Sequence, residues 1–329
     1  MPANLPPDYY AAERRYRAAT DIQDKIQILR EMLAIMPKHK GTDHLQGDIK
    51  RKIAKLNSEA QKKKGASRQS AFDHIPSEGA GQAVIAGLPN TGKSTIVRQL
   101  THARPDVADF PFSTFKPVCG MMPFRDIQIQ LIDLPPIDEK FTESWVYTIL
   151  RVADVLIWTA DLSDDAVIDK MLVFKNVISS HHIVLVPQGE SKPQGATARK
   201  TTLFLGTKSD TPNALQRWER CLDCLKEPLA RCTVSMNTHE GIDSFKEHLF
   251  RCLHIVRVYT KMPGKETDLE KPYILPENAT VWDAAISIHK ELADEMTFAR
   301  IWGSEMYDGQ RVTREHVLSD GDVLEIHRK

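Results

Sequence analysis

Residues 87–95 read Gly-Leu-Pro-Asn-Thr-Gly-Lys-Ser-Thr and follow the short apolar run 82–86. Two glycines separated by four residues and followed by Lys-Ser match the phosphate-binding loop, which needs a strand before it and a helix after it. In such a loop, backbone N–H groups and the positive end of the helix surround phosphate oxygens. The stretch therefore predicts a polyphosphate site with a charge from Lys93 and a hydroxyl from Ser94 for Mg²⁺. The residues expected to contact phosphates are Asn90, Thr91, Gly92, Lys93, Ser94 and Thr95.

Strands and helices are predicted to alternate around this loop. Apolar residues at 127, 129 and 131 alternate with glutamines, as in a half-exposed strand. The compact apolar runs 155–158, 183–186 and 203–205 are typical of buried parallel strands, with a weaker strand at 232–235. The order strand, loop, helix predicts an α/β fold with a doubly wound, mostly parallel sheet. The polar stretch Gln188–Lys200 is expected to be a surface excursion.

Two positions beyond the loop carry oxygen atoms that suit a magnesium ion. Asp133 ends the alternating strand, and a carboxylate there can hold Mg²⁺ through water. Thr114 lies between the loop and that strand, where it can complete the Mg²⁺ shell and sense a γ-phosphate. The alternatives are an aspartate at an ordinary turn and a threonine in an ordinary loop.

The tetrapeptide Thr207-Lys208-Ser209-Asp210 follows the 203–205 strand and predicts the base. A carboxylate at Asp210 can accept two N–H bonds from guanine, a pair that adenine does not offer. Lys208 can lay its aliphatic stem over the base. Ser235, Met236 and Asn237 follow the last strand of this region and can contact the base through their backbone. These residues predict GTP or GDP as the ligand and disfavour a P-loop ATPase or kinase.

The two ends of the chain show different patterns. Apolar stripes at 22, 26, 29 and 33 and at 45, 49, 53 and 56 predict an N-terminal helical hairpin. After a strand at 256–260 and a loop rich in Pro, Gly and Lys, Thr280 opens a helix that extends to Leu292, with Asp283 as a capping-box partner. Short strands at 299–302 and 323–326 complete a small α+β domain. The predicted domains are a helical hairpin with a basic linker (1–70), a nucleotide-binding domain (71–255) and a C-terminal domain (256–329).

Composition limits the remaining classes of function. The 44 basic and 44 acidic residues balance, so no global field favours DNA or a membrane. No apolar run approaches the roughly 20 residues of a membrane span, and the N-terminus lacks a signal-peptide layout, so a cytoplasmic protein is expected. Cys221 and Cys224 have the spacing of half a zinc site, but buried reduced thiols are expected. The basic clusters 50–55 and 62–68 either contact RNA phosphates or form a solvated surface.

In this order, the motifs resemble those of the developmentally regulated GTP-binding proteins, in the Obg group of translation-associated GTPases. The resemblance covers nearly the whole chain and extends to 257–264, 279–281 and 299–303, which look like the TGS domain, a β-grasp module. It implies a ribosome-associated GTPase that acts through RNA and translation factors, with a protein regulator that binds the TGS domain. It also implies that Asn90 helps to bind K⁺.

One departure from that family concerns hydrolysis. The family has glycine where this chain has Pro136, and that glycine normally gives its backbone N–H to the γ-phosphate. Proline has no N–H, and a lost bond to a charged group costs roughly 1.5–3 kcal/mol. Ile137 stands where Ras-like enzymes have a water-orienting glutamine. Two hypotheses follow: a slow Mg²⁺-dependent GTPase with Lys93 and Thr114 in its catalytic centre, or a GTP/GDP-binding scaffold that hydrolyses little.

Overall fold

The computed structural model describes residues 6, 9, 12–13, 15–16, 22–36, 46–53, 75–101, 117–138, 142–189, 197–264, 267–303 and 307–328. The chain divides into two compact units, Met1–His74 and Ile75–Lys329. Part of the predicted second stripe, at 45 and 56, and the basic segment 62–68 lie outside the described residues.

The first unit is helical. Helix α2 spans Ile22–Ile35, and residues 46–53 form a second helix. Leu29 and Ile49 are buried in one apolar cluster, as two facing amphipathic stripes require. Tyr9 and Ala12 join the same cluster from helical residues that the sequence analysis did not predict. An ion pair of 2.7 Å between Arg15 and Glu31 also connects that segment to α2.

The second unit contains a seven-stranded sheet in the order β2-β3-β1-β4-β6-β5, with β7 also paired to β6. The strands are β1 (Gln82–Ala86), β2 (Val118–Phe124), β3 (Ile127–Asp133), β4 (Val155–Asp161), β5 (Ile183–Val186), β6 (Ala198–Thr207) and β7 (Ala230–Val234). Every pairing is parallel except that of β2 with β3. The predicted doubly wound, mostly parallel sheet is therefore confirmed.

Two parts of this sheet differ from the prediction. Strand β2 was not predicted, because its Gly120 and Pro123 are poor strand residues, although an edge strand tolerates proline. Strand β6 begins at Ala198, so the end of the expected surface excursion pairs with β5. The charged residues at the start of β6 made this pairing difficult to predict. The Lys200 stem is nevertheless buried, and its ammonium group donates a hydrogen bond to the Ala153 carbonyl.

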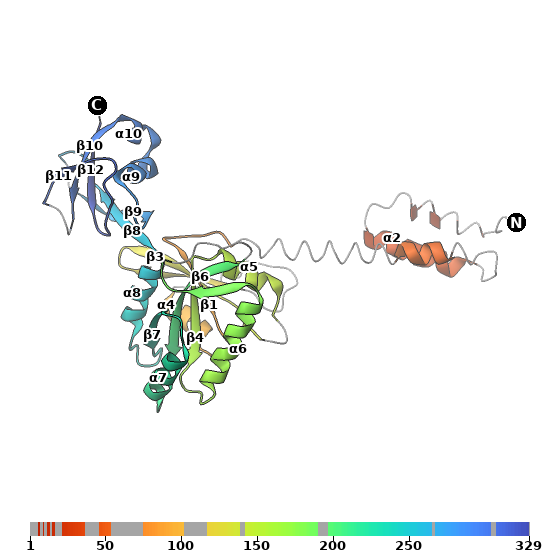
Figure 1. The fold of residues 1–329 in the computed structure, drawn as a ribbon. Coiled ribbons are helices and arrows are strands. Elements are labelled where there is room, and N and C mark those ends of the chain that lie inside the picture. Colours follow the sequence, from red (N-terminus) through yellow and green to blue (C-terminus); the bar gives the residue numbers. More distant parts are fainter. Residues whose placement is uncertain are drawn as a thin grey trace. The chain divides into compact units, whose positions relative to one another are not determined.

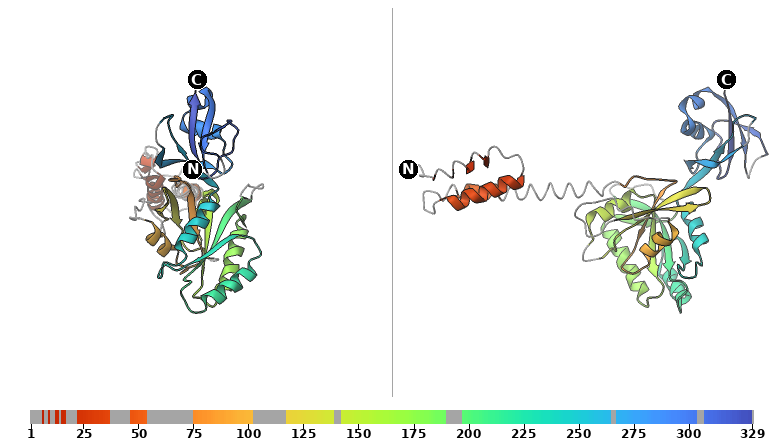
Figure 2. Two further views of the ribbon diagram at one scale, coloured as in Figure 1. Left: turned by 90° about the vertical axis from the view of Figure 1, so that its left-hand side faces the viewer. Right: turned by 180° about the vertical axis from the view of Figure 1, so that it is seen from behind.

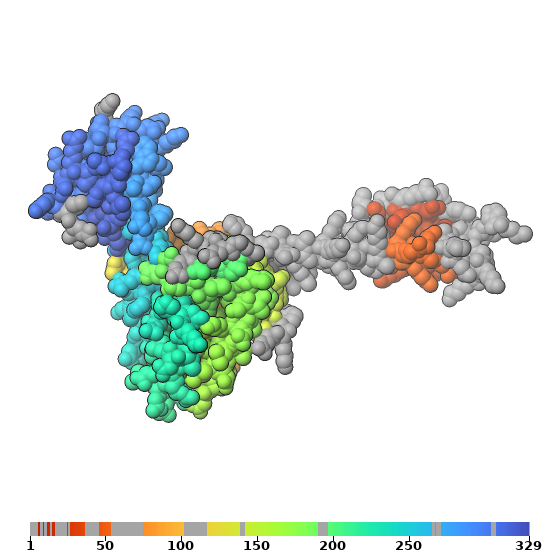
Figure 3. Space-filling model, viewed as in Figure 1, coloured from red at the N-terminus to blue at the C-terminus, as the bar shows by residue number. Residues whose placement is uncertain are grey.

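Helices cover both faces of the sheet (Figure 1, Figure 2). On one face, α4 (Lys93–Leu100) and α8 (Ile242–Cys252) pack their apolar side chains into the core around β1, β3 and β6. On the other, α6 (Val167–Ser180) and α7 (Ala214–Cys224) contribute rings to an aromatic stack. Trp158 stacks on Phe174 and Phe204 stacks on Trp218, each with centroids 5.2 Å apart. Figure 3 shows the outer surface of α6 and α7 as continuous. Helix α5 (Ser144–Val152) follows β3.

A separate five-stranded sheet forms the C-terminal part, in the order β11-β10-β12-β8-β9. Its strands are β8 (Ile255–Thr260), β9 (Asp268–Pro276), β10 (Met296–Trp302), β11 (Gln310–Val312) and β12 (Val323–Arg328). Helix α9 (Val281–Ile288) packs on it through Val281, Ala284 and Ala285. The predicted capping box is confirmed, because Thr280 and Asp283 bond each other's backbone N–H groups.

The C-terminal prediction was wrong in two respects. Strand β9 occupies about half of the stretch expected to be a loop, and it pairs with β8. The helix that begins after Thr280 ends at Ile288, and Leu292 belongs to a second helix, α10 (Lys290–Glu295). The break lies at His289, which has extended backbone and accepts a hydrogen bond from Glu291 N to cap α10. Among the helices described, none has the length and apolar character needed to cross a membrane.

Candidate nucleotide-binding site

The predicted phosphate loop joins β1 to α4. Asn90 and Gly92 have positive φ angles of 65° and 83°, which turn the chain sharply into the helix. Lys93 is only 5% exposed, and its Nζ donates to the carbonyls of Gly87 (3.2 Å) and Leu88 (2.7 Å). Burial lowers the pKa of Lys93 to about 8, although the nearby Asp133 charge opposes this. The loop thus holds a poorly solvated cation, which a phosphate would stabilise.

Neighbouring strands brace the loop. A Cβ on Gly87 would lie 2.3 Å from Thr159 Oγ1, so the close approach of β4 requires glycine there. The hydroxyl oxygens of Thr159 and Thr91 are 2.7 Å apart. Thr207 Oγ1 donates to the carbonyls of Thr91 (3.0 Å) and Ala160 (3.1 Å), and so ties the end of β6 to the loop. Thr207 therefore helps to hold the backbone of the phosphate loop in place.

A cleft of about 800 Å³ lies over the loop, within the size range of ligand pockets. Its walls come from four separate parts of the sequence, which meet at the carboxyl ends of the parallel strands. The lining residues are Asn90, Thr91, Gly92, Lys93, Ser94, Thr95, Val118, Asp133, Leu134, Pro135, Pro136 and Lys208. The structure thus brings the predicted phosphate residues together with Asp133 and Lys208. Thr114 lies outside the described residues.

Asp133 and Ser94 form an oxygen-rich corner of this cleft. Asp133 is 8% exposed, and its Oδ1 is buried without a hydrogen-bond partner in the part of the chain that the structure describes. Burial raises the pKa of Asp133, while a hydrogen bond from Ser94 and the charge of Lys93 act in the opposite direction. A buried carboxylate oxygen with no donor, next to a hydroxyl, fits the ligand preference of Mg²⁺.

The predicted base residues meet at the ends of β6 and β7. Asp210 Oδ1 accepts a hydrogen bond of 2.7 Å from Ser235 Oγ, and its Oδ2 accepts one of 3.1 Å from Asn237 Nδ2. These bonds, that of Ser235 first, lower the pKa of Asp210. The carboxylate is therefore charged and oriented at neutral pH, as an acceptor for a purine edge must be. The Met236 side chain instead packs against the apolar core near α8.

The sequence analysis missed two contacts at this end of the site, that of the Asn237 side chain and that of Asp161. Asn237 lies two residues after Ser235 and completes the contacts of Asp210. Asp161 ends the buried strand β4, as Asp133 ends β3, and it accepts a hydrogen bond of 2.6 Å from Lys208. An aspartate directly after an apolar strand was the available signal, because the ends of parallel strands share one edge of the sheet.

The two cysteines of α7 differ in their exposure. Cys221 is buried but Cys224 is exposed, so the expectation of two buried thiols was wrong for Cys224, which lies in the last turn of the helix. Within the described ranges, no three His, Cys, Asp or Glu side chains are grouped closely enough to hold a metal ion.

Comparison with known proteins agrees with this geometry. The family model for 50S ribosome-binding GTPases matches residues 82–187, and the TGS-domain model matches 256–328. Developmentally-regulated G-protein 3 of Arabidopsis thaliana is 26% identical over 94% of this chain and 99% of its own length. A homolog of developmentally-regulated GTP-binding protein 2 from Dictyostelium discoideum is 26% identical over 94% of this chain and all of its own. The chain is a relative of the developmentally regulated GTP-binding proteins.

The chain is thus a GTP-binding protein of the P-loop GTPase family with a C-terminal TGS domain. An uncharacterized GTP-binding protein of Methanocaldococcus jannaschii is also 26% identical, over 93% of this chain and 92% of that protein. A GTP-binding protein from Pyrococcus horikoshii is a structural neighbour with a TM-score of 0.47 and 12% identity, covering 75% of this chain and 100% of that one.

The segment after Asp133 uses its backbone N–H groups inside the protein. Leu134 N donates to the Ile85 carbonyl and Ile137 N to the Gly87 carbonyl, each at 3.2 Å. Pro136, which lines the cleft, has no N–H to donate. The Ile137 side chain is fully buried. Residues 134–137 therefore present no free backbone N–H to a γ-phosphate in this arrangement.

Proposed function

We propose that this chain is a slow Mg²⁺-dependent GTPase that acts as a switch with the ribosome or another RNA partner. The observation that carries the hydrolytic part is the buried Asp133 Oδ1, which lacks a hydrogen-bond donor and lies in the same cleft as Lys93 and Ser94. A GTPase needs a carboxylate and a hydroxyl for Mg²⁺ beside the phosphate loop. The base-side carboxylate of Asp210, charged and oriented, supports GTP as the substrate.

In this proposal each group has a defined task. Lys93 and the amides of the loop bind and neutralise phosphate charge, which is the main catalytic contribution in this class of reaction. Ser94, Asp133 and Thr114 would hold Mg²⁺, which supplies charge stabilisation when bound, and Asn90 would help to hold K⁺. Ile137, at the position where Ras-like enzymes orient water with a glutamine, is apolar and buried. The intrinsic rate is therefore expected to be low.

Single-turnover phosphate release from bound GTP tests the hydrolytic part. The measurement compares the chain with and without Mg²⁺, with and without K⁺, and with and without ribosomes. Release that requires Mg²⁺ and is accelerated by ribosomes supports the switch. If no phosphate is released under any of these conditions, the chain is not a GTPase.

A second candidate, a GTP- or GDP-binding scaffold with little hydrolysis, is favoured by one observation. The backbone N–H groups of Leu134 and Ile137 are used inside the protein, and Pro136 has none. Replacing Pro136 with glycine restores an amide at that position. If the missing amide limits hydrolysis, we expect about a tenfold or greater increase in the single-turnover rate, since a bond to a charged group is worth roughly 1.5–3 kcal/mol.

Pro136→Ala is the matched control for that substitution. It also restores an N–H but lacks the flexibility of glycine, so an equal acceleration in both variants would identify the amide as the cause. An unchanged rate in both would exclude the amide as the limiting factor.

The proposal of an RNA partner rests on exposed basic side chains in the first unit. Lys50, Arg51 and Lys52 are all exposed on the second helix, and Arg51 forms an ion pair with Asp48 at 2.8 Å. Exchanging the three for glutamate should reduce the salt dependence of ribosome binding, because fewer counterions are released. The matched variant carries three glutamines, and an unaltered salt slope in both would leave this helix as a solvated surface.

The same proposal places the protein in the cytoplasm and assigns a protein regulator to the TGS domain.

A further inference from the structure

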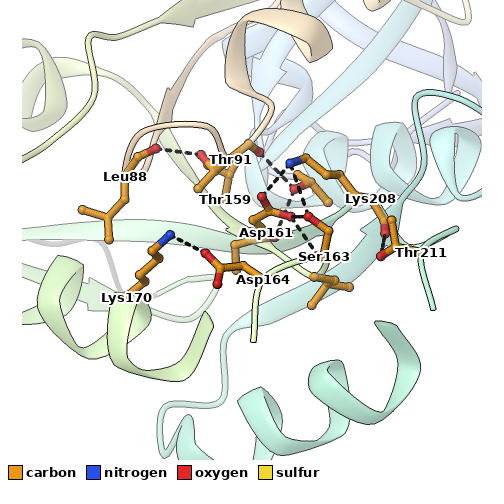
Figure 4. A network of polar contacts seen from close by, with 12 residues as sticks. Leu88, Thr91, Thr159, Asp161, Ser163, Asp164, Lys170, Lys208 and Thr211 are labelled. Carbon is orange, nitrogen blue, oxygen red and sulfur yellow. Dashed lines mark hydrogen bonds and ion pairs between the residues drawn. The ribbon is translucent and has the colours of Figure 1, made fainter. Parts of the chain in front are cut away.

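The ammonium group of Lys208 is paired with a carboxylate that lies outside the nucleotide motifs. Asp161 Oδ2 accepts a hydrogen bond of 2.6 Å from Lys208 Nζ (Figure 4). Asp161 Oδ1 accepts two more, from the backbone N–H (2.9 Å) and the hydroxyl (2.6 Å) of Ser163. The Asp161 side chain is 11% exposed, so solvent screens this ion pair less than a surface pair. Both carboxylate oxygens are therefore occupied, and the group has a fixed orientation.

The backbone of Lys208 is fixed as well. Its φ angle of 56° lies in the left-handed region, which is uncommon for a residue with a side chain. Thr211 stabilises this turn by donating its N–H (3.1 Å) and its hydroxyl (2.8 Å) to the Lys208 carbonyl. The parallel register of β4 and β6 pairs Asp161 with Thr207, the residue before Lys208. The lysine is thus held at both ends, and it lines the nucleotide cleft.

We infer that Asp161, oriented by Ser163, is a positioning residue for guanine binding that acts through Lys208. With its ammonium turned to Asp161, Lys208 offers its aliphatic stem as a preformed surface for the base. A long side chain that is already ordered loses less conformational freedom when the ligand binds, and this raises affinity. The inference rests on the proposed guanine site at Asp210 and adds to it a group that does not touch the nucleotide.

The neighbouring carboxylates offer a matched comparison. Asp164 pairs with Lys170 of α6, and Asp165 accepts hydrogen bonds from Arg217 of α7. The Asp165 side chain is 93% exposed and is not one of the residues that line the cleft. Asp165→Asn therefore removes a charge and an ion pair from the same loop without touching Lys208.

A double-mutant cycle tests the inference on the full chain in the presence of Mg²⁺. Dissociation constants for GDP and for inorganic tripolyphosphate are measured by calorimetry for the wild type, Asp161→Asn, Lys208→Met, the double variant and Asp165→Asn. We expect Asp161→Asn to weaken GDP about three- to tenfold, the size expected when one side chain must be ordered on binding. Tripolyphosphate, which uses only the phosphate loop, should bind equally well. In the Lys208→Met background, Asp161→Asn should have no further effect.

Three outcomes would overturn the inference. Equal losses for GDP and tripolyphosphate would mean that Asp161 supports the fold in general. A loss of the same size in the Lys208→Met background would mean that Asp161 does not act through Lys208, and an equal loss in Asp165→Asn would reduce the effect to the charge of the loop. Failure of the guanine site itself is distinguishable, because the wild type would then bind tripolyphosphate as tightly as GDP and would prefer no base.

Discussion

Lys93 is the residue at which pH should alter nucleotide binding. Burial lowers its pKa to about 8, below the value of 10.5 for an exposed lysine. The charged form is therefore disfavoured in the folded protein, and this burial reduces stability below pH 8. The penalty is relieved as pH rises from about 8 towards 10.5, where the unfolded chain binds the extra proton. Bound phosphates should restore the charge, so binding above pH 8 should take up a proton.

Calorimetry of GDP binding in two buffers with different ionisation enthalpies measures this uptake. About one unit above the lysine pKa, most of a proton should be taken up per nucleotide, and about one unit below it, very little. Lys93→Arg is the control, because a guanidinium stays protonated at these pH values. Binding enthalpies that do not depend on the buffer at the higher pH would refute the prediction.

At the scale of elements, the capping box of α9 is the local feature with the clearest energetic consequence. Thr280 Oγ1 accepts from Asp283 N, and Asp283 Oδ2 accepts from Thr280 N at 2.8 Å. Replacing a capping threonine with alanine costs about 1 kcal/mol, so Thr280→Ala should lower the free energy of unfolding by that amount. Urea denaturation measures the change, and Thr280→Ser, which keeps the hydroxyl, should restore most of it. Equal stability of the alanine and serine variants would show that the hydroxyl contributes nothing.

At the scale of the whole molecule, a buried charge cluster joins the two sheets of the second unit. Arg257 of β8 is 8% exposed, and its guanidinium contacts Asp126, in the turn between β2 and β3, as well as Asp320. Tyr259 also donates to Asp126. Desolvation raises the pKa of Asp126, but the hydrogen bonds from Tyr259 and Arg257 outweigh it and the pKa is lowered. This contribution to stability is present above the ordinary carboxyl pKa and is lost as pH falls through the lowered value.

Asp126→Ala should therefore weaken the coupling between the two sheets. The substitution leaves the Arg257 and Tyr259 donors without the carboxylate that accepts their hydrogen bonds, which costs about 1–3 kcal/mol. In scanning calorimetry we expect the C-terminal sheet to melt at a lower temperature, separated from the nucleotide-binding sheet. Glu247→Ala removes an exposed partner of the adjacent Arg125 and should change little. A single unshifted transition for Asp126→Ala would mean that the cluster adds nothing to the junction.

Features that depend on neighbours along the chain could be predicted from the amino-acid sequence. The loop at 87–95 was predictable because phosphate binding needs a fixed spacing of Gly, Lys and Ser after a strand. The buried strands appeared as compact apolar runs, and the start of α9 as Thr280 followed by Asp283. Strands β2 and β9 escaped prediction because Gly, Pro and charged residues weaken their local pattern, and pairing with β3 and β8 supplies what that pattern lacks.

The side-chain contacts at the base end of the site depend on the folded arrangement of the strands. Thr207 reaches the Thr91 carbonyl, Lys208 reaches Asp161, and Asp210 receives both Ser235 and Asn237. These partners come from different strands, and nothing in their spacing along the chain reveals the contacts. They meet because parallel strands present their carboxyl ends at one edge of the sheet, and that arrangement follows from the packing of the whole core.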